Sequence, residues 1–503
     1  MSSANPTTRP AVLTIAASDS AGMAGVQMDV RTQAALGVHA LTVVTATTAQ
    51  NSQRVVSVNP VSVQVMEDQF AALAELDVAA VKIGLLVSAA QLEVVLKHLE
   101  RVAAPVVLDP VLSASSGRSL GEPGLAEQLL RKLLPRCDLV TPNVAELVRL
   151  TGEPIRDFGD VERAARALLG AGARRVLVKG GHLPNSVGDA ATVQDYFCSA
   201  RGGFWLAGQR LAADNARGTG CAFASAAAAA LALGYRYRDA VVIAKMAMHQ
   251  GLRHAYAVGG QAGPVAVQRW PDRQEELPRL SSRADGAAVP TAAFPACTGP
   301  ALGLYPVVDR AAWLERLLPL GVTTAQLRVK DLDGPALAAE VSRAVAVARR
   351  YHCRLFINDH WRLAMAQGAY GVHLGQEDLD SADLAAIRRA GLRLGVSSHC
   401  HYEVARAHAV RPSYIACGPI YPTTSKVMPW QPQGIAGLRY WQSLLDYPLV
   451  AIGGIDEDRM AAVAGTGVSG IALISAITAA SEPEQATRRL LAAIERGRSG
   501  PAA

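Results

Sequence analysis

The chain has 503 residues, of which 50% are hydrophobic and 18% are charged. These proportions suit about two to four folded domains and exclude a chain that is disordered throughout. The 49 basic and 43 acidic residues leave a formal net charge of only +6, and no dense run of lysine or arginine accompanies it. This charge gives little support to nucleic-acid binding, whereas small anionic substrates are compatible with it.

Cysteine usage and hydropathy indicate the cellular setting. The seven cysteines are scattered, odd in number and form no Cys-x-x-Cys pair, so a reducing cytoplasm is expected rather than a disulfide framework. Residues 1–10 lack the apolar core of a signal peptide and are predicted to be disordered. The most apolar run, residues 222–233, falls well short of the ~20 residues that span a bilayer, so no membrane association is expected.

Residues 11–272 alternate short β-like runs with helical patterns, which predicts an α/β domain. The expected strands are 12–16, 41–45, 80–83, 106–108, 139–141 and 176–178. The first of them leads into a turn of small residues around Asp19, from Ala17 to Gly25. Small residues let a ligand approach the backbone, but this turn is equally typical of a plain helix cap.

The strongest local signal of this half is Gly218-Thr219-Gly220-Cys221, directly before the alanine-rich run 222–233. Glycines at the start of a helix expose backbone N–H groups at its positive end, so Gly218, Thr219 and Gly220 are predicted to hold a phosphate group. A cysteine at that position is expected to have a depressed pKa and to accept a proton from an alcohol. The alternative reading is that Cys221 is a small buried residue that packs the helix.

The composition becomes polar and loses periodicity over residues 273–300, which predicts a linker. Beyond it, over residues 301–497, eight β-like runs alternate with amphipathic segments. The runs are 304–308, 325–329, 354–357, 371–374, 393–396, 414–416, 449–452 and 470–474. Eight such units in about 195 residues predict a (β/α)8 TIM barrel, with an open doubly wound sheet as the alternative.

Polar groups suited to phosphate or metal follow almost every one of these eight runs. The second run ends in Gln326, Arg328 and Lys330, which strand alternation puts on one face. The later runs end in Asn358-Asp359, in 375–378 with Asp378, in Ser397, in 418–426, in Gly453-Gly454 and in Ile474-Ser475. Barrel enzymes carry their chemistry at this rim and often bind phosphate after strands seven and eight, so the pattern predicts a phosphate-handling site.

The C-terminal motifs resemble those of thiamine-phosphate synthase. They are Gln-Leu-Arg-x-Lys, Ile-Asn-Asp, Gly-Val-His-Leu-Gly-Gln-Glu-Asp, Gly-Pro-Ile-Tyr-Pro-Thr-Thr-Ser-Lys and Ala-Ile-Gly-Gly-Ile. The resemblance implies that hydroxymethylpyrimidine diphosphate is joined to thiazole phosphate with release of pyrophosphate. It assigns the pyrimidine diphosphate to Gln326, Arg328, Lys330, Asn358, Ser397 and Lys426, Mg²⁺ to Asp359 and Asp378, and the thiazole phosphate to Thr423, Ser425, Gly454, Ile474 and Ser475. Ser425 stands where the family usually has threonine, and the hydroxyl is kept.

The N-terminal motifs are similar to those of hydroxymethylpyrimidine/phosphomethylpyrimidine kinase, which has the ribokinase-like fold. They are Ser-Asp-Ser…Gly-Val-Gln-x-Asp, Thr-Ala-Gln-Asn, Val-Lys-Ile-Gly, Asp-Pro-Val, Thr-Pro-Asn-x-x-Glu, Val-Lys-Gly-Gly-His and Gly-Thr-Gly-Cys. The likeness implies two successive ATP-dependent phosphorylations of the pyrimidine. It assigns the substrate to Gln50 and Asp29, the phosphates to Lys179 and the turn at 218–221, and the role of base to Cys221; Asp109 and Glu146 are candidates near Mg²⁺. The chain departs from the family at Ala17, Ala21, Met23 and Ala216-Arg217.

The two resemblances support each other, because the product expected of the first domain is the substrate expected of the second. Together they predict a bifunctional enzyme of thiamine biosynthesis that uses ATP and Mg²⁺, acts on small molecules and leaves a homo-oligomer possible. Two alternatives stay open: the barrel could be a thiazole tautomerase, and the altered turns could make the first domain a non-catalytic pyrimidine-binding module. Asp359, Asp378, Arg328 and Lys330 disfavour the tautomerase, which has no diphosphate leaving group to stabilise.

Overall fold

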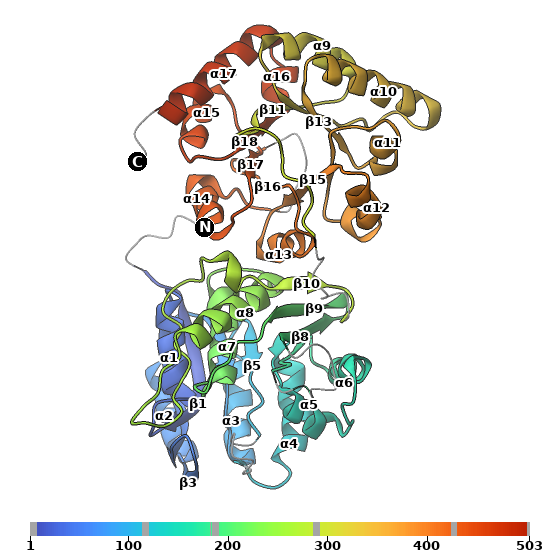
Figure 1. Cartoon of the computed structure of the whole chain (residues 1–503). Helices are drawn as coiled ribbons and strands as arrows, with labels where there is room; N and C mark the ends of the chain where they lie inside the picture. The colour runs from blue at the N-terminus through green and yellow to red at the C-terminus, as the bar shows by residue number, and fades with distance from the viewer. Residues whose placement is uncertain are drawn as a thin grey trace. The chain divides into compact units, whose positions relative to one another are not determined.

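The computed structural model (Figure 1) describes residues 8–112, 120–181, 183, 191–284, 292–423 and 430–499. The chain divides into two compact units, and the division falls largely within the segment predicted as a linker. No helix in these described ranges is both long and apolar enough to cross a membrane.

The N-terminal unit is built on one ten-stranded sheet, in the order β10-β9-β8-β7-β6-β5-β4-β1-β2-β3. The six strands from β7 to β2 are parallel, and the chain reverses its direction of sheet growth between β1 and β4. Such a reversal is where open α/β sheets bind ligands. The strands are β1 Ala11–Asp19, β2 His39–Gln50, β3 Val55–Pro60, β4 Val78–Ile83, β5 Val106–Leu108, β6 Leu139–Val140, β7 Arg175–Val178, β8 Thr192–Ser199, β9 Gly202–Gln209 and β10 Arg279–Ser281.

Helices connect and cover these strands (Figure 1). They are α1 Gly25–Ala35, α2 Val63–Ala72, α3 Ala89–Leu99, α4 Leu125–Gln128, α5 Val144–Thr151, α6 Phe158–Gly170, α7 Thr219–Ala232 and α8 Tyr237–Arg253. Helix α7 packs against α1, α8 and β4, and its residues 222–230 are almost fully buried. Because alanine has no side chain beyond Cβ, this run lets α7 lie close to the sheet and brings its first turn to the strand ends.

The six strands predicted for this unit are all present, but β3, β8, β9 and β10 were not predicted. All four pair antiparallel at the two edges of the sheet. Strand β10 lies inside the segment 273–300 and pairs with β9 through Leu280 and Leu206. That part of the predicted linker is therefore a sheet strand, because its apolar residues complete the edge of the N-terminal sheet.

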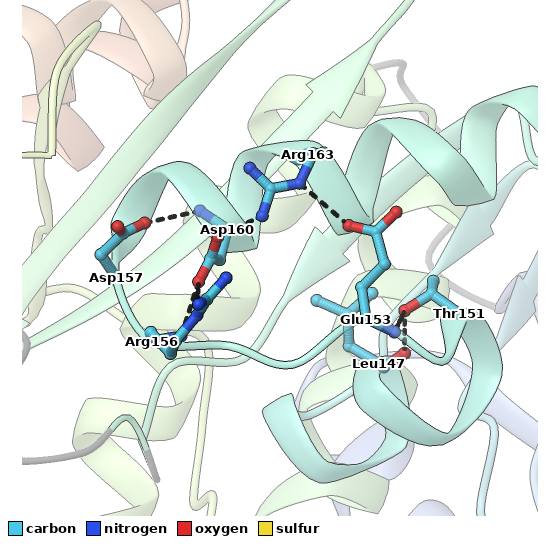
Figure 2. Close-up of polar contacts among 7 residues, drawn as sticks. All are labelled: Leu147, Thr151, Glu153, Arg156, Asp157, Asp160 and Arg163. Atoms are coloured by element: carbon cyan, nitrogen blue, oxygen red, sulfur yellow. Dashed lines mark hydrogen bonds and ion pairs between the residues drawn. The ribbon is translucent and has the colours of Figure 1, made fainter.

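A group of polar contacts fixes the connection from α5 to α6 (Figure 2). Arg163 lies between two carboxylates: its Nε donates to Glu153 at 3.1 Å, and its guanidinium also pairs with Asp160. Asp160 in turn accepts from the backbone N–H of Arg156 at 2.8 Å. The N–H of Arg156 and the guanidinium of Arg163 lower the pKa of Asp160. These contacts hold α5, whose first turn borders the site described below.

The C-terminal unit is a closed barrel of eight parallel strands, which confirms the predicted TIM barrel and excludes the open sheet. The strands are β11 Gly303–Val308, β12 Thr324–Leu327, β13 Arg354–Asn358, β14 Gly371–Leu374, β15 Arg393–Ser398, β16 Tyr414–Cys417, β17 Leu449–Ile452 and β18 Gly470–Leu473. Each lies within about two residues of its predicted bounds. Every strand carried its own apolar run and turn, so short local patterns were sufficient.

Helices surround this barrel (Figure 1). They are α9 Ala311–Leu317, α10 Gly334–Arg350, α11 Trp361–Ala366, α12 Leu384–Arg389, α13 His401–Val410, α14 Gly434–Leu444, α15 Glu457–Ala464, α16 Ser475–Thr478 and α17 Pro483–Ser499. Residues 292–300, also predicted as linker, pack on the barrel: the backbone N–H of Phe294 donates to Arg411, and the hydroxyl of Ser413 donates to the carbonyl of Pro295 at 2.6 Å. The barrel interior is filled by aromatic and aliphatic side chains that include Tyr305, Phe356 and Tyr414.

Candidate active sites

The turn after β1 is held by one carboxylate. The Asp19 side chain accepts hydrogen bonds from the backbone N–H groups of Ala21, Met23 and Ala24 at 2.8 to 2.9 Å. Asp19 therefore holds the turn that precedes α1, whose N-cap Ala24 provides no side-chain cap, and this turn brings the backbone at Met23 against the start of α7. A Cβ at Gly218 would lie 2.2 Å from the Met23 carbonyl oxygen, so only glycine permits this approach.

The first turn of α7 meets the ends of β5 and β7. Gly218 has a φ of 77° and caps the helix, as its sequence predicted. Lys179, directly after β7, donates to Asp109, directly after β5, with 2.6 Å between Nζ and Oδ1. A Cβ on Gly220 would lie 3.1 Å from the Lys179 Nζ. The predicted phosphate-binding groups, Lys179 and the 218–220 turn, are thus brought together at the carboxyl ends of the strands.

Glu146 borders the same cluster from α5. It forms a capping box with Asn143, in which the backbone N–H of each residue donates to the other side chain. Burial raises the pKa of Glu146 to about 7, and nearby Asp109 adds to this while Lys179 opposes it. Burial would lower the pKa of Lys179, but the carboxylates of Asp109 and Glu146 outweigh it and raise that pKa. Lys179 therefore stays charged among two carboxylates that a cation or a phosphate could compete for.

Asp29 lies deeper than predicted. Its side chain is completely buried on α1, where one oxygen accepts from the Lys82 ammonium at 2.7 Å and the other from the Ser225 hydroxyl at 2.8 Å. Both oxygens are occupied, so a direct substrate contact does not follow from this geometry. Burial would lower the pKa of Lys82, but Asp29 overcomes it and the pKa is raised. Lys82 lies on β4, beside the point between β1 and β4 where sheet growth reverses. Its motif, Val-Lys-Ile-Gly, was recognised in the sequence, but no role was assigned to Lys82.

The expected depression of the Cys221 pKa is wrong. Burial raises the pKa of the Cys221 thiol to about 12, and the nearby Lys82 ammonium does not compensate. The carboxylates of Asp29 and Asp109 act in the same direction as burial. The argument from the helix N-terminus failed because it ignored first the burial of the thiol and then these carboxylates, all of which favour the neutral thiol over the thiolate.

Gln50 and Arg217 lie at the edge of this region. The backbone N–H of Gln50, the last residue of β2, donates to the Ser20 hydroxyl at 3.0 Å, and its half-buried side chain belongs to the strand edge beside the turn at 19–25. The Arg217 guanidinium donates to the backbone carbonyl of Ser52. One of the two unusual residues before Gly218 therefore fastens the segment after β2 to the start of α7.

In the barrel, the two predicted metal ligands lie beside each other. The carboxyl groups of Asp359, after β13, and Asp378, after β14, are within hydrogen-bonding reach, and Lys330 donates to Asp359 at 2.5 Å. Burial and the Asp359 charge raise the pKa of Asp378. Burial opposes the ionisation of Asp359, but Lys330 outweighs it and lowers the pKa of Asp359. Two carboxylates held this close favour a cation between them.

The backbone at Asp359 is unusual as well. Its φ of 60° is a left-handed conformation that non-glycine residues rarely adopt. The backbone N–H of Asp359 donates to the carbonyl of His373 at 3.0 Å, which fixes this residue to the neighbouring strand. Strained backbone of this kind costs about 1–3 kcal/mol and is concentrated at functional sites. Asn358, the preceding residue, is buried at the end of β13.

A chain of hydrogen bonds crosses the barrel interior below this pair. It joins the hydroxyl of Ser397 to the side chain of Gln326 through His373, Tyr414 and Tyr305. Burial lowers the pKa of His373 to about 4, so the imidazole is neutral. Of these five residues only Gln326 and Ser397 were predicted as site residues. No role was assigned to His373, Tyr305 and Tyr414, because they stand inside apolar strands.

The predicted thiazole-phosphate residues come from neighbouring loops. Gly454 has a φ of 65°, and a Cβ there would lie 2.3 Å from the Pro422 carbonyl oxygen, next to Thr423. Ile474 caps the short helix α16, which Ser475 begins. Ser425 and Lys426 lie outside the described residues. Arg459 was not predicted: it donates to the Gly454 carbonyl at 2.6 Å and covers the ring of Tyr421.

Arg328 and Lys330 lie just beyond the end of β12 rather than within it. The backbone N–H of Arg328 donates to the Val308 carbonyl at 2.7 Å, which keeps the loop beside β11.

Across the described residues, no group of three or more histidine, cysteine, aspartate or glutamate side chains is placed to hold a metal ion. Asp359 and Asp378 would therefore need other oxygen ligands, such as substrate phosphate and water, as Mg²⁺ sites commonly use.

Both units thus place cationic groups and paired carboxylates at the carboxyl ends of parallel strands, which is the arrangement of enzymes that act on phosphate esters. Comparison with known proteins separates the two halves. Residues 19–266 match the family described as phosphomethylpyrimidine kinase, and residues 304–477 match the family described as thiamine monophosphate synthase.

A curated relative agrees with this division in the barrel. Thiamine-phosphate synthase of Serratia proteamaculans is 58% identical over 206 residues, which are 41% of this chain and 97% of that protein. Among solved structures, phosphomethylpyrimidine kinase of Clostridium difficile is 32% identical, with 48% of this chain and 98% of that one covered and a TM-score of 0.42. A pyridoxal kinase of Staphylococcus aureus is 26% identical, covering 55% and 99%, with a TM-score of 0.49.

The chain belongs to the thiamine-phosphate synthase family through its barrel, and residues 19–266 of its N-terminal unit match the phosphomethylpyrimidine kinase family. It is a bifunctional enzyme of thiamine biosynthesis that uses ATP as a co-substrate. The tautomerase and the non-catalytic binding module gain no support from these comparisons.

Proposed function

We propose that the N-terminal unit phosphorylates hydroxymethylpyrimidine and then its monophosphate, and that the transferring phosphoryl group lies over the first turn of α7. The observation that carries this is the meeting of Lys179, Asp109 and the Gly218–Gly220 turn at the strand ends. Phosphoryl transfer passes through a loose transition state, so catalysis rests mainly on positioning and on neutralising charge. Lys179 and the N–H groups of α7 supply that charge, and Gln50 lies where it could contact the pyrimidine.

The raised pKa of Cys221 changes the role proposed for this residue. A thiol whose pKa is raised by burial is protonated at neutral pH, which disfavours it as the acceptor of the substrate alcohol's proton. We therefore propose that Cys221 positions the reacting groups at the start of α7 rather than acting as a general base.

Cys221→Ser tests this role, because a serine hydroxyl is also protonated and is nearly as small. We expect kcat of the kinase to stay within about tenfold of the wild type and the pH–rate profile to keep its shape. Steady-state kinetics from pH 6 to pH 10 check this. A loss of 10³-fold or more in Cys221→Ser, with a wild-type profile that follows a single basic group, would restore the thiolate base.

For the barrel we propose condensation of hydroxymethylpyrimidine diphosphate with thiazole phosphate, with release of pyrophosphate. The electron-rich aminopyrimidine can carry positive charge at its methylene carbon as the diphosphate leaves, and the thiazole nitrogen then forms the new C–N bond. No protein nucleophile is needed, so Arg328, Lys330 and the buried amide of Asn358 act by holding the diphosphate. Thr423, Gly454, Ile474 and Ser475, together with Ser425 and Lys426, keep the roles that the resemblance implies.

The adjacent carboxyl groups of Asp359 and Asp378 fit Mg²⁺, because both are hard oxygen donors and because burial, with the neighbouring Asp359 charge, raises the pKa of Asp378. Bound there, Mg²⁺ would supply positive charge to the leaving diphosphate. The chain's own contribution is to hold the two carboxylates together: Lys330 orients Asp359, and the backbone N–H of Gly375 donates to Asp378 at 3.2 Å.

Asp378→Asn separates charge repulsion from metal binding. Without Mg²⁺ we expect the variant to melt at a higher temperature than the wild type at neutral pH, because the raised pKa of Asp378 makes its ionisation destabilising as pH rises. With Mg²⁺ the wild type should gain stability and the variant should not. Calorimetric melting with and without Mg²⁺ measures this; an equal gain in both proteins would remove Asp378 from the metal site.

A coupled assay tests the two activities in one chain. Purified protein with hydroxymethylpyrimidine, thiazole phosphate, ATP and Mg²⁺ should form thiamine phosphate, with two ATP consumed for each pyrimidine diphosphate made. Binding of hydroxymethylpyrimidine without ATP consumption would contradict the kinase proposal. We further propose a cytoplasmic location, which is supported by seven cysteines that are all free.

A further inference from the structure

The polar chain across the barrel interior is continuous from one side of the site to the other. Ser397 Oγ lies 2.8 Å from His373 Nε2, and His373 Nδ1 lies 2.7 Å from the Tyr414 hydroxyl. The Tyr414 and Tyr305 hydroxyls are 2.8 Å apart, and Gln326 Nε2 is 3.5 Å from the Tyr305 hydroxyl. The two ends, Gln326 and Ser397, are both residues assigned to the pyrimidine by resemblance; the three inner residues have no assigned role.

Only one direction of donation satisfies every group in this chain. If Gln326 donates to Tyr305, Tyr305 to Tyr414, Tyr414 to His373 Nδ1, and His373 Nε2–H to Ser397, each inner hydroxyl gives one hydrogen bond and accepts one. In the opposite direction the Tyr305 oxygen would accept from both Tyr414 and Gln326. Its own proton would then have no acceptor among the contacts of the described residues, which is costly for a buried hydroxyl.

The three inner residues of this hydrogen-bonded series are buried in the barrel core. Tyr305, Tyr414 and His373 are at most 7% exposed and are packed with Phe356 and aliphatic side chains. Neither nitrogen of His373 has a carboxylate as its hydrogen-bond partner; both face hydroxyls. With Nδ1 accepting from the Tyr414 hydroxyl and Nε2 donating to the Ser397 hydroxyl, the His373 ring passes the direction set at Tyr414 on to Ser397.

The backbone makes room for this path. Gly395, on β15, lies opposite Tyr414 in the strand register, and a Cβ at Gly395 would be 2.1 Å from the Tyr414 ring and 2.3 Å from its hydroxyl oxygen. Any larger residue would displace the ring. The glycine therefore permits Tyr414 to cross β15 and reach His373 on β14.

We propose that Tyr305, Tyr414 and His373 are positioning residues that fix the donor–acceptor sense of the pyrimidine site, and that they select a 4-aminopyrimidine over a 4-oxopyrimidine. In the favoured direction the Ser397 hydroxyl proton is left to donate to a ring nitrogen. The Gln326 amide turns its nitrogen to Tyr305 and keeps its carbonyl oxygen for a donor such as an amino group. A 4-oxo ring presents an acceptor where the amino group presents a donor, so the site opposes it. This inference rests on the function proposed for the barrel.

The test compares two inhibitors of the condensation: the monophosphates of the 4-amino and the 4-oxo hydroxymethylpyrimidine. Assays supply pyrimidine diphosphate and omit ATP, so that only the barrel reacts. In Tyr305→Phe the Gln326 amide is free to reverse, and in Tyr414→Phe the imidazole is free to change tautomer. Each variant should lower the ratio of the 4-oxo to the 4-amino inhibition constant about tenfold or more, mainly by improving binding of the 4-oxo compound.

Tyr370→Phe is the matched control, because it removes a tyrosine hydroxyl at the opposite end of the barrel strands, where it contacts Thr298. It should leave the ratio unchanged. Kinase turnover and the melting temperature of each full-length variant report folding. If one of Tyr305→Phe and Tyr414→Phe does not fold, the other is sufficient for the test. An unchanged ratio in a folded Tyr305→Phe or Tyr414→Phe, even with lower kcat, overturns the proposal and leaves these tyrosines a structural role. Failure of the wild type to form thiamine phosphate would instead contradict the function.

Discussion

Replacing Lys179 with methionine is expected to lower kcat of the kinase by about 10²- to 10³-fold while changing KM for the pyrimidine far less. Lys179 stays charged between Asp109 and Glu146, 2.6 Å from the Asp109 carboxylate, whereas the other nearby ammonium, that of Lys82, is held by Asp29 at 2.7 Å. Removing a charge aimed at a transferring group costs on this order in other enzymes. Steady-state phosphorylation of hydroxymethylpyrimidine measures the effect.

Lys97→Met serves as the control for this substitution. Lys97 pairs with Glu67 at 2.9 Å on the surface, with 57% of its side chain exposed, and such pairs contribute little to stability. Its kinase rate should match the wild type. The barrel reaction, measured with added pyrimidine diphosphate, should be normal in both variants. A Lys179→Met enzyme with wild-type kcat and a raised KM would show that Lys179 binds the ground state only.

In the barrel, Asp359→Asn is expected to lower condensation by about 10³-fold or more. The change removes one of two adjacent carboxylates and the negative charge that pairs with Lys330, so both the proposed cation site and the ion pair that holds a cationic side chain are altered. Pyrophosphate release with both substrates measures the rate, and titration of Mg²⁺ should show a loss of apparent affinity.

Asp383→Asn is a control of the same chemical change. Asp383 caps α12 by accepting from the backbone N–H of Ala386, and asparagine caps a helix equally well. Its condensation rate should be close to that of the wild type. An Asp359→Asn enzyme that keeps its rate and its Mg²⁺ dependence would exclude Asp359 as a metal ligand.

The barrel could be predicted from the sequence because each of its strands is a short apolar run that ends in its own polar tip. In the N-terminal unit the six parallel strands were recognised for the same reason. Strands β8 and β9 were not, since polar Gln194 and Asp195 interrupt the run of β8, glycines interrupt that of β9, and the two strands are stabilised by pairing with each other. Pairing of this kind depends on partners distant in sequence, which local periodicity does not contain.

The candidate sites divide in a similar way. Separate motifs contain Lys179 and the 218–220 turn in the first unit, and separate motifs contain Asp359 and Asp378 in the second. In each unit the structure brings the two groups together. What a motif does not report is burial. Asp29 and Cys221 belong to correct motifs, but the ion pair with Lys82 and the desolvated thiol follow from how α1, α7 and β4 pack. Tyr305 and Tyr414 show the converse, because their polar role is hidden within apolar strands.

The pairing of β10 with β9 determines where the two catalytic bodies can be separated. A kinase fragment that ended at residue 272 would lose β10 and leave β9 as an open edge next to Trp205 and Leu206. Unprotected edges of this kind promote association between chains. A soluble, independently folding kinase would therefore have to retain residues through 281, which makes this part of the connecting segment structurally a part of the first unit.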